Sequence, residues 1–286
     1  MSTIEATHGW LQSTLSADQT QRRAAEEALK QSEFAAEHVV HLFRIAADTS
    51  VAVDVALRQA AAIRMKTVIS RGWDSADGKA ALSAADKAAV RDNLVEAMVV
   101  AVPVVRTQLG LCLRSIAQID YPGNWPGLLP AICANMQQQN TERVYGALFA
   151  LRMLVKVYEF RKEAERTPLH AAVEQTWPLM AQLVEMLIAT PSVEGAELAL
   201  LAMKVFWSAT QISLPPLLLR PEQLAVLLLA ENLTLTPTLT NPYPNPTLTL
   251  TLTRCGCACS SACSSSRCHQ ARPTTSRPQR RGGRGR

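Results

Sequence analysis

The chain has 286 residues, of which 48% are hydrophobic and 19% charged, a composition typical of a protein that buries a sizeable core. Its formal net charge of +5 is unevenly spread, because residues 1–230 contain 21 Lys and Arg against 23 Asp and Glu. Residues 231–286 contain eight Arg against one Glu. We therefore expect no nucleic-acid binding from the first 230 residues. No apolar run approaches the roughly 18 residues of a membrane span, so no membrane partner is expected.

Helical periodicity dominates residues 1–230, and no stretch there alternates with the period of a strand. Prolines in first turns and a capping box of Ser83 with Asp86 mark helix starts. We expect helices over 4–14, 17–32, 34–47, 51–72, 84–101, 104–119, 126–138, 141–161, 168–189, 193–213 and 221–230.

These helices recur as pairs of about 40 to 47 residues, the size of a HEAT or armadillo unit. The pattern predicts an all-α, right-handed HEAT-repeat solenoid of about five helix pairs, whose inner helices line a concave surface. An irregular helical bundle is the alternative that the same periodicity permits.

The character of the sequence changes near Thr234, where alternating Leu and Thr and blocks of Asn and Pro begin. A CCCTAA nucleotide repeat encodes Leu-Thr in one frame and Pro-Asn in another. We interpret residues 231–286 as a disordered low-complexity tail that a gene model has attached to a truncated helical body. A cDNA that reads continuously through this segment would contradict the interpretation. The open end of such a body would expose apolar surface, so we expect the chain as written to be prone to aggregation.

The sequence shows no constellation of catalytic residues. Four histidines of the body are scattered, and we interpret them as ordinary surface or boundary residues: His8, His38, His41 and His170. There is neither a Gly-rich phosphate loop nor a Gly-x-Ser-x-Gly motif, so we expect no enzyme and no cofactor.

The cysteines, like the charges, are distributed unevenly between the helical body and the tail. Cys112 and Cys133 are the two in the helical body, which forms no disulfide framework and favours a reducing compartment. The five cysteines of the tail precede His269 without the paired spacing of a zinc site, so no metal is expected. The Arg/Gly-rich end would bind RNA electrostatically if the tail is genuine.

The segment Leu57–Trp73 predicts one amphipathic helix with a buried stripe on one side. Arg58, Arg64, Lys66 and Arg71 occupy its remaining surface. On local grounds these cations form a solvated face that keeps a solenoid soluble. The segment from Tyr121 to Pro130 similarly predicts a corner between repeats, with Trp125 as a packing residue.

Three groups of segments resemble the N-terminal part of importin-beta-type karyopherins, in the family's order. They are Arg22–Lys30 with Leu57–Lys66 and Trp73, then Asp120-Tyr-Pro-Gly-Asn-Trp-Pro126, then Leu151–Lys162 with Glu165–Leu169. The third group is similar to the importin-seven/importin-eight branch in particular. The resemblance covers residues 4 to about 230.

This resemblance implies a nuclear transport receptor that performs no chemistry and occurs in the cytoplasm and the nucleus, including the nuclear envelope and pore. It implies that residues 1–120 are repeats that bind the GTP form of Ran and that residues 121–230 are further, truncated repeats. Cargo proteins and nucleoporins would bind a full-length receptor.

By helix order we expect the inner helices 17–32, 51–72 and 104–119 to form the Ran face. The residues expected to contribute are Arg58, Arg64, Lys66, Arg71 and Arg114. The alternatives are a HEAT-repeat scaffold or adaptor without Ran dependence, and an export receptor of the same superfamily.

Overall fold

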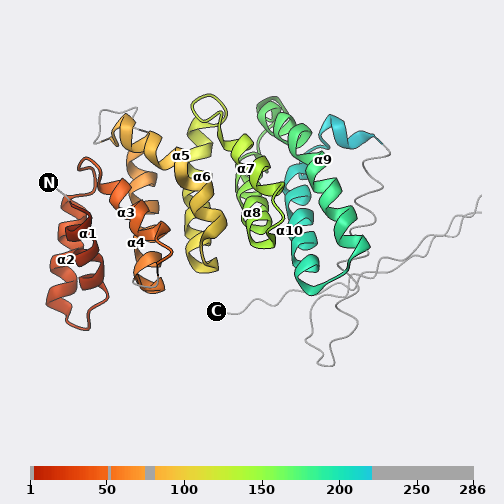
Figure 1. The fold of residues 1–286 in the computed structure, drawn as a ribbon. Helices are drawn as coiled ribbons and strands as arrows, with labels where there is room; N and C mark the ends of the chain where they lie inside the picture. Colours follow the sequence, from red (N-terminus) through yellow and green to blue (C-terminus); the bar gives the residue numbers. More distant parts are fainter. Residues whose placement is uncertain (1–2, 51–52, 75–80, 221–286) are drawn as a thin grey trace, which may run out of the picture. The chain divides into compact units, whose positions relative to one another are not determined.

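A computed structural model describes residues 3–50, 53–74 and 81–220 of the chain (Figure 1). These residues form ten α-helices and two short 3-10 helices, η1 and η2, and within the described ranges there is no strand. The α-helices are α1 Ile4–Thr14, α2 Gln19–Gln31, α3 His38–Ala47, α4 Val55–Gly72, α5 Ala84–Val100, α6 Pro103–Asp120, α7 Leu128–Met136, α8 Thr141–Tyr158, α9 Thr167–Ala189 and α10 Val193–Thr210.

Consecutive helices pack as five antiparallel pairs, which confirms the expected all-α fold and number of repeats. The first helices of the pairs (α1, α3, α5, α7 and α9) stack on one another in one layer. The second helices α4, α6, α8 and α10 stack in the other, and α2 joins them through a hydrogen bond from Arg64 Nη2 to the Leu29 carbonyl. We call these five helices the second-helix layer. They include the three that the sequence analysis assigned to an inner face.

The predicted and observed helix boundaries agree to within four residues, and the largest differences are at the starts of α3 and α4, which begin at His38 and Val55 instead of at residues 34 and 51. The helix expected over 141–161 ends at Tyr158, and η1 (Glu163–Glu165) follows it. The helix expected over 193–213 ends at Thr210, before η2 (Pro216–Leu219). The expected helix 221–230 and the low-complexity tail lie outside the described residues.

The predicted capping box at Ser83 is half confirmed. Ser83 Oγ accepts the Asp86 N–H at 3.0 Å and begins α5. The Asp86 carboxylate accepts instead from the backbone N–H of Glu37, at 3.2 Å. Glu37 directly precedes α3 and has a φ of 63°, so this contact links the starts of two successive first-layer helices.

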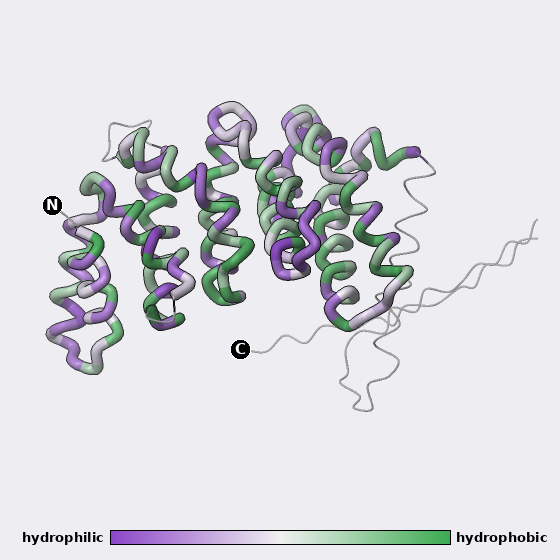
Figure 2. Tube along the Cα trace, in the orientation of Figure 1, coloured by the Kyte–Doolittle hydropathy of each residue, from purple (hydrophilic) through white to green (hydrophobic). Residues whose placement is uncertain are grey.

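One large hydrophobic core extends through all five pairs, and a small second cluster contains Val184 of α9 and Ala202 of α10. Hydrophobic residues recur in the helices of both layers, and α2 is the most hydrophilic helix (Figure 2). The interpretation of His38 and His41 as surface or boundary residues is wrong, because the two are 0% and 6% exposed. They lie on α3, where eight of ten residues are buried, so this helix is enclosed on nearly all sides.

The pKa of His38 is lowered from 6.5 to about 4, mainly by burial and further by the nearby positive charges of Arg64 and of His41 when it is protonated. The folded protein therefore favours neutral His38, and this contribution to stability is complete above pH 6.5 and disappears as the pH falls toward 4. We expect the melting temperature to drop over this interval, and to drop less in His38→Gln, when both are followed by circular dichroism.

A matched control for this prediction is His8→Gln, because His8 is a half-buried histidine on α1. It should keep the pH dependence of the wild type. An identical profile for His38→Gln and the wild type would contradict the assignment to His38.

The corner after α6 is organised by Asp120, which is 6% exposed. Its carbonyl accepts the backbone N–H groups of Asn124 and Trp125, at 2.7 and 3.1 Å. Its carboxylate Oδ2 accepts from Trp73 Nε1 at 2.8 Å and from Arg91 Nη1 at 2.9 Å. Asp120 thus joins the end of α4, the middle of α5 and the corner itself. Trp125 is 4% exposed, as expected for a packing residue.

Candidate functional site

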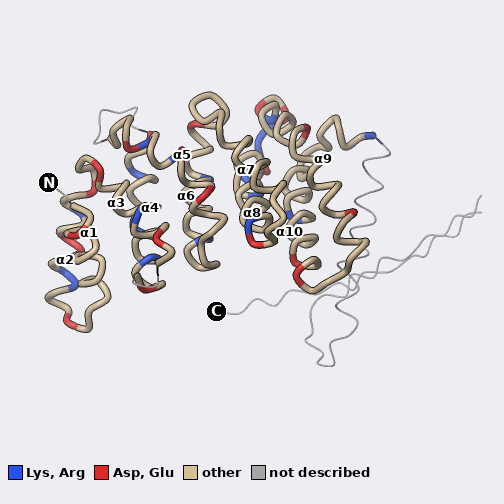
Figure 3. Tube along the Cα trace, in the orientation of Figure 1, with Lys and Arg blue, Asp and Glu red and all other residues tan. Residues whose placement is uncertain are grey.

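The five candidate cations lie on two neighbouring helices of the second-helix layer, four on α4 and Arg114 on α6. Acidic and basic residues are interspersed along this layer (Figure 3). Arg71 and Arg114 are exposed, and Arg64 and Lys66 are partly buried.

Arg58 does not lie on the surface of α4, and the expectation that it does is wrong. The residue is 5% exposed, and its Nε has no hydrogen-bond partner within the described structure. The pKa of the neighbouring Asp48 is lowered mainly by hydrogen bonds from Ser50, and the positive charge of Arg58 lowers it slightly further. A residue buried in this way presents no charge to a partner.

Each of the other four cations contacts a group on a neighbouring second-layer helix or at its end. Arg64 Nη2 donates to the Leu29 carbonyl of α2 at 3.0 Å. Lys66 Nζ donates to Gln108 Oε1 of α6 at 3.2 Å. Arg114 Nη2 donates to the Lys156 carbonyl of α8 at 3.4 Å. The candidate binding residues are therefore also links between successive helix pairs.

Arg71 makes its link through a buried carboxylate. Its Nη1 lies 3.2 and 3.1 Å from Oε1 and Oε2 of Glu33, which follows α2. Arg64 Nη2 also faces this carboxylate, at 3.8 Å. The Glu33 side chain is 6% exposed, whereas that of Arg71 is 57% exposed.

Arg106 joins three helices, although it is not among the residues predicted for the site from the sequence. Arg106 is 6% exposed, and its Nε donates to the Met98 carbonyl of α5 at 3.1 Å. Its Nη2 lies 3.2 Å from Glu142 Oε2 of α8, and its guanidinium stands 5.2 Å from the centre of the Tyr145 ring. No local pattern identifies such a residue, because its partners lie on other helices.

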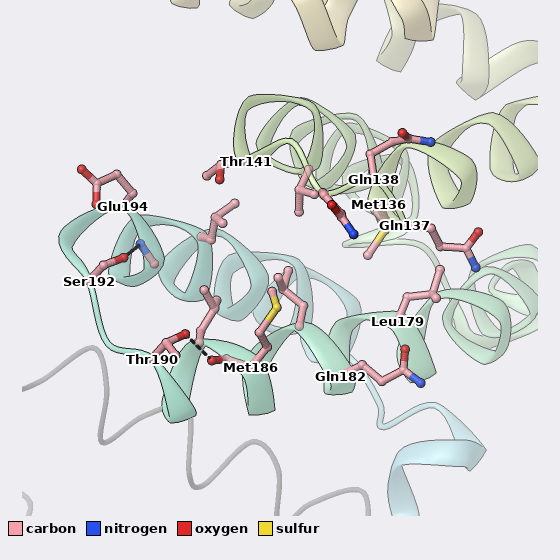
Figure 4. A pocket seen from close by; sticks show the side chains of 16 residues that line it. Met136, Gln137, Gln138, Thr141, Leu179, Gln182, Met186, Thr190, Ser192 and Glu194 are labelled. Carbon is pink, nitrogen blue, oxygen red and sulfur yellow. Dashed lines mark hydrogen bonds between the residues drawn. The ribbon is translucent and has the colours of Figure 1, made fainter.

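A groove of about 800 Å³ opens between α7, the start of α8, α9 and α10 (Figure 4). It exists because α7 has 9 residues and the neighbouring α9 has 23, so the second half of α9 extends past the end of α7. Leucines, methionines and four glutamines are among the residues that line it, and Glu194 is the single acidic residue of the lining (Figure 4). Such a lining offers apolar contact and hydrogen bonds but no nucleophile paired with a base.

The described residues also bear on metal-binding and membrane-spanning classes of protein. Within them, no group of three or more His, Cys, Asp or Glu side chains could hold a metal ion. None of the helices placed by the structure is both long and apolar enough to span a membrane.

Comparison with known proteins identifies the family. Residues 25–100, from α2 to the end of α5, match the importin-beta N-terminal domain. The chain contains the N-terminal part of an importin-beta-type karyopherin. Over 204 residues this karyopherin is 35% identical to an importin beta-like SAD2 homolog of Arabidopsis thaliana, a match that covers 70% of the chain and 19% of the relative.

Further relatives support the importin-seven/importin-eight branch. The chain is 34% identical to importin-8 of Homo sapiens over 201 residues, 68% of the chain and 19% of that protein. A probable importin-7 homolog of Dictyostelium discoideum is 26% identical over 74% of the chain and 20% of its own length. The karyopherin chain thus spans about a fifth of the length of the curated relatives that it matches.

A solved structure confirms the repeat fold. The exportin Cse1 in its cargo-free, cytoplasmic state matches 78% of the chain with a TM-score of 0.70, at 20% identity and over 25% of its own chain. At this identity the match shows the fold, which is that of a HEAT-repeat solenoid.

Proposed function

We propose that the chain acts as the Ran-binding end of a nuclear import receptor. The observation that carries the proposal is the importin-beta N-terminal domain over residues 25–100, whose α4 presents Arg64, Lys66 and Arg71 on the second-helix layer. Arg114 extends this set of cations onto α6. We assign GTP-bound Ran to residues 1–120 and treat 121–220 as repeats that continue the solenoid.

Import is favoured over export by the relatives. Those named importin-8 are 33 to 34% identical to the chain, whereas exportin-2 of Drosophila melanogaster is 28% identical over 54% of it. The longer receptor that these proteins represent would carry cargo proteins, contact nucleoporins and move between cytoplasm and nucleus. We place this chain in the same two compartments and expect no catalysis from it.

The physical basis of such a receptor is linkage between two ligands. If Ran and cargo favour different curvatures of one solenoid, each changes the affinity for the other by the same factor. Small rotations between helix pairs accumulate along the stack and change the curvature of the solenoid. Contacts between pairs, such as the hydrogen bond from Lys66 to Gln108, lie where a bound partner would alter these rotations.

The proposal predicts that the chain binds Ran loaded with GTP in preference to Ran loaded with GDP. Charge reversal in Arg64→Glu, Arg71→Glu or Arg114→Glu should weaken Ran-GTP binding by about tenfold or more, because an attractive contact becomes repulsive. Calorimetric titration measures both effects.

Lys204→Glu provides the control, because Lys204 is an exposed cation of the same layer but lies on α10, outside the matched domain. It should leave the affinity unchanged. If binding does not depend on the nucleotide, or the three reversals have no effect, a scaffold without Ran dependence becomes the better interpretation.

A further inference from the structure

Glu33 distinguishes the link between the first two helix pairs from the links that follow. Its carboxylate is buried and faces Arg71 at 3.1 Å and Arg64 at 3.8 Å. Lys66 and Arg114 instead donate to neutral oxygens, the amide of Gln108 and the carbonyl of Lys156. A neutral acceptor leaves the positive charge available to a partner, whereas a carboxylate compensates it.

An acidic partner surface that approaches α4 must therefore compete with Glu33. The Arg71 side chain is 57% exposed, so an incoming carboxylate can reach the guanidinium from solvent. If Arg71 turns toward the partner, Glu33 keeps its more distant contact with Arg64 but loses both hydrogen bonds from Arg71 Nη1. A buried carboxylate without such bonds is costly, and it regains water only if the segment after α2 moves away from α4.

We propose that Glu33 is an internal competitor for acidic partners of α4, and that it couples their binding to the contact between the first and second helix pairs. This inference rests on the proposed function and extends it, because it names carboxylates as the recognised chemistry and one residue as the regulator. Reciprocity follows from linkage: whatever loosens α2 from α4 raises affinity for the partner, and the bound partner loosens α2.

The test is Glu33→Gln in the full chain, titrated with Ran-GTP and, in parallel, with a poly-glutamate peptide as a generic acidic probe. The amide keeps the shape of the side chain and removes its charge. We expect about a tenfold gain in affinity at low salt, a smaller gain at high salt, and faster hydrogen exchange in α2.

Two further variants show whether the gain acts through the proposed pair. In an Arg71→Ala background Glu33→Gln should give a clearly smaller gain, because the main competed group is absent and only the more distant Arg64, at 3.8 Å, remains. Glu96→Gln removes a carboxylate from another interhelical pair, with Arg143 on α8, and should leave both affinities unchanged. Should Glu33→Gln fail to fold, Glu33→Asp retains the charge on a shorter side chain and should give a partial gain.

The outcomes separate the two proposals. Poly-glutamate that binds more tightly to Glu33→Gln than to the wild type, with no Ran-GTP binding by either, supports the competitor and rejects Ran as the partner. Unchanged or weaker binding of both probes to Glu33→Gln, with Ran-GTP still bound by the wild type, overturns the competitor and leaves the proposed function in place. If neither probe binds the wild type or Glu33→Gln, both proposals are rejected.

Discussion

Asp120→Ala is expected to lower the free energy of unfolding by about 3–5 kcal/mol, as is typical when one partner of a buried ion pair is removed. The substitution leaves two donors without their acceptor: the guanidinium of Arg91 and the indole N–H of Trp73, which is 2% exposed. Urea unfolding followed by far-UV circular dichroism measures the loss.

Asp120→Asn should lose less, because the amide oxygen still accepts one hydrogen bond although the ion pair with Arg91 is gone. The matched control is Asp92→Asn, which changes an exposed carboxylate beside Arg91 and should alter stability by no more than about 0.5 kcal/mol. A loss below about 1 kcal/mol in Asp120→Ala would show that the corner does not depend on this carboxylate.

Asp120 also shows which features of the fold can be predicted from the sequence and which cannot. The corner motif that contains it and the Trp73 end of α4 both belong to the segments that carry the family resemblance. Nothing in the sequence indicates that they meet, because Asp120 lies 47 residues from Trp73 and 29 from Arg91. Periodicity and proline positions predict the helices and their pairing, since these are local signals. The hydrogen bonds between pairs join residues that are far apart in the sequence, so no local signal predicts them.

The two errors of exposure have local causes that the pattern already contained. Arg58 adjoins Leu57 and lies one helical turn before Ala61 and Ala62, all three of them buried. His38 and His41 lie in a segment that is apolar on nearly every side, which is typical of an enclosed helix. In both cases position on the helix, and not residue type, determines the exposure of the side chain.

The candidate site was predicted in part. Helix order placed α4 and α6 in one layer correctly, and three of the four cations chosen on α4 reach its surface or its partly buried rim. Glu33 could not be predicted to oppose them. It lies 38 residues before Arg71, in a stretch that reads as the polar end of an amphipathic helix.

Gly146→Ala is expected to destabilise the fold by about 2–3 kcal/mol, although alanine is the better helix former. Gly146 lies on α8 where this helix crosses α5, and a Cβ added there would stand 2.5 Å from the Cα of Val99. Backbone cannot rotate away as a side chain can, so α5 and α8 must separate along their whole contact. Thermal and urea unfolding of the variant measure the cost.

Two other glycines calibrate this prediction. A Cβ added at Gly110 would meet the Phe149 side chain at 2.6 Å, and because that ring can move, Gly110→Ala should cost less than Gly146→Ala. At Gly9, inside α1, an added Cβ meets nothing within 4 Å, so Gly9→Ala should stabilise the protein by about 0.5–1 kcal/mol. Equal stabilisation by alanine at all three positions would show that helix propensity outweighs the close crossing of α5 and α8, and that this crossing does not require glycine at position 146.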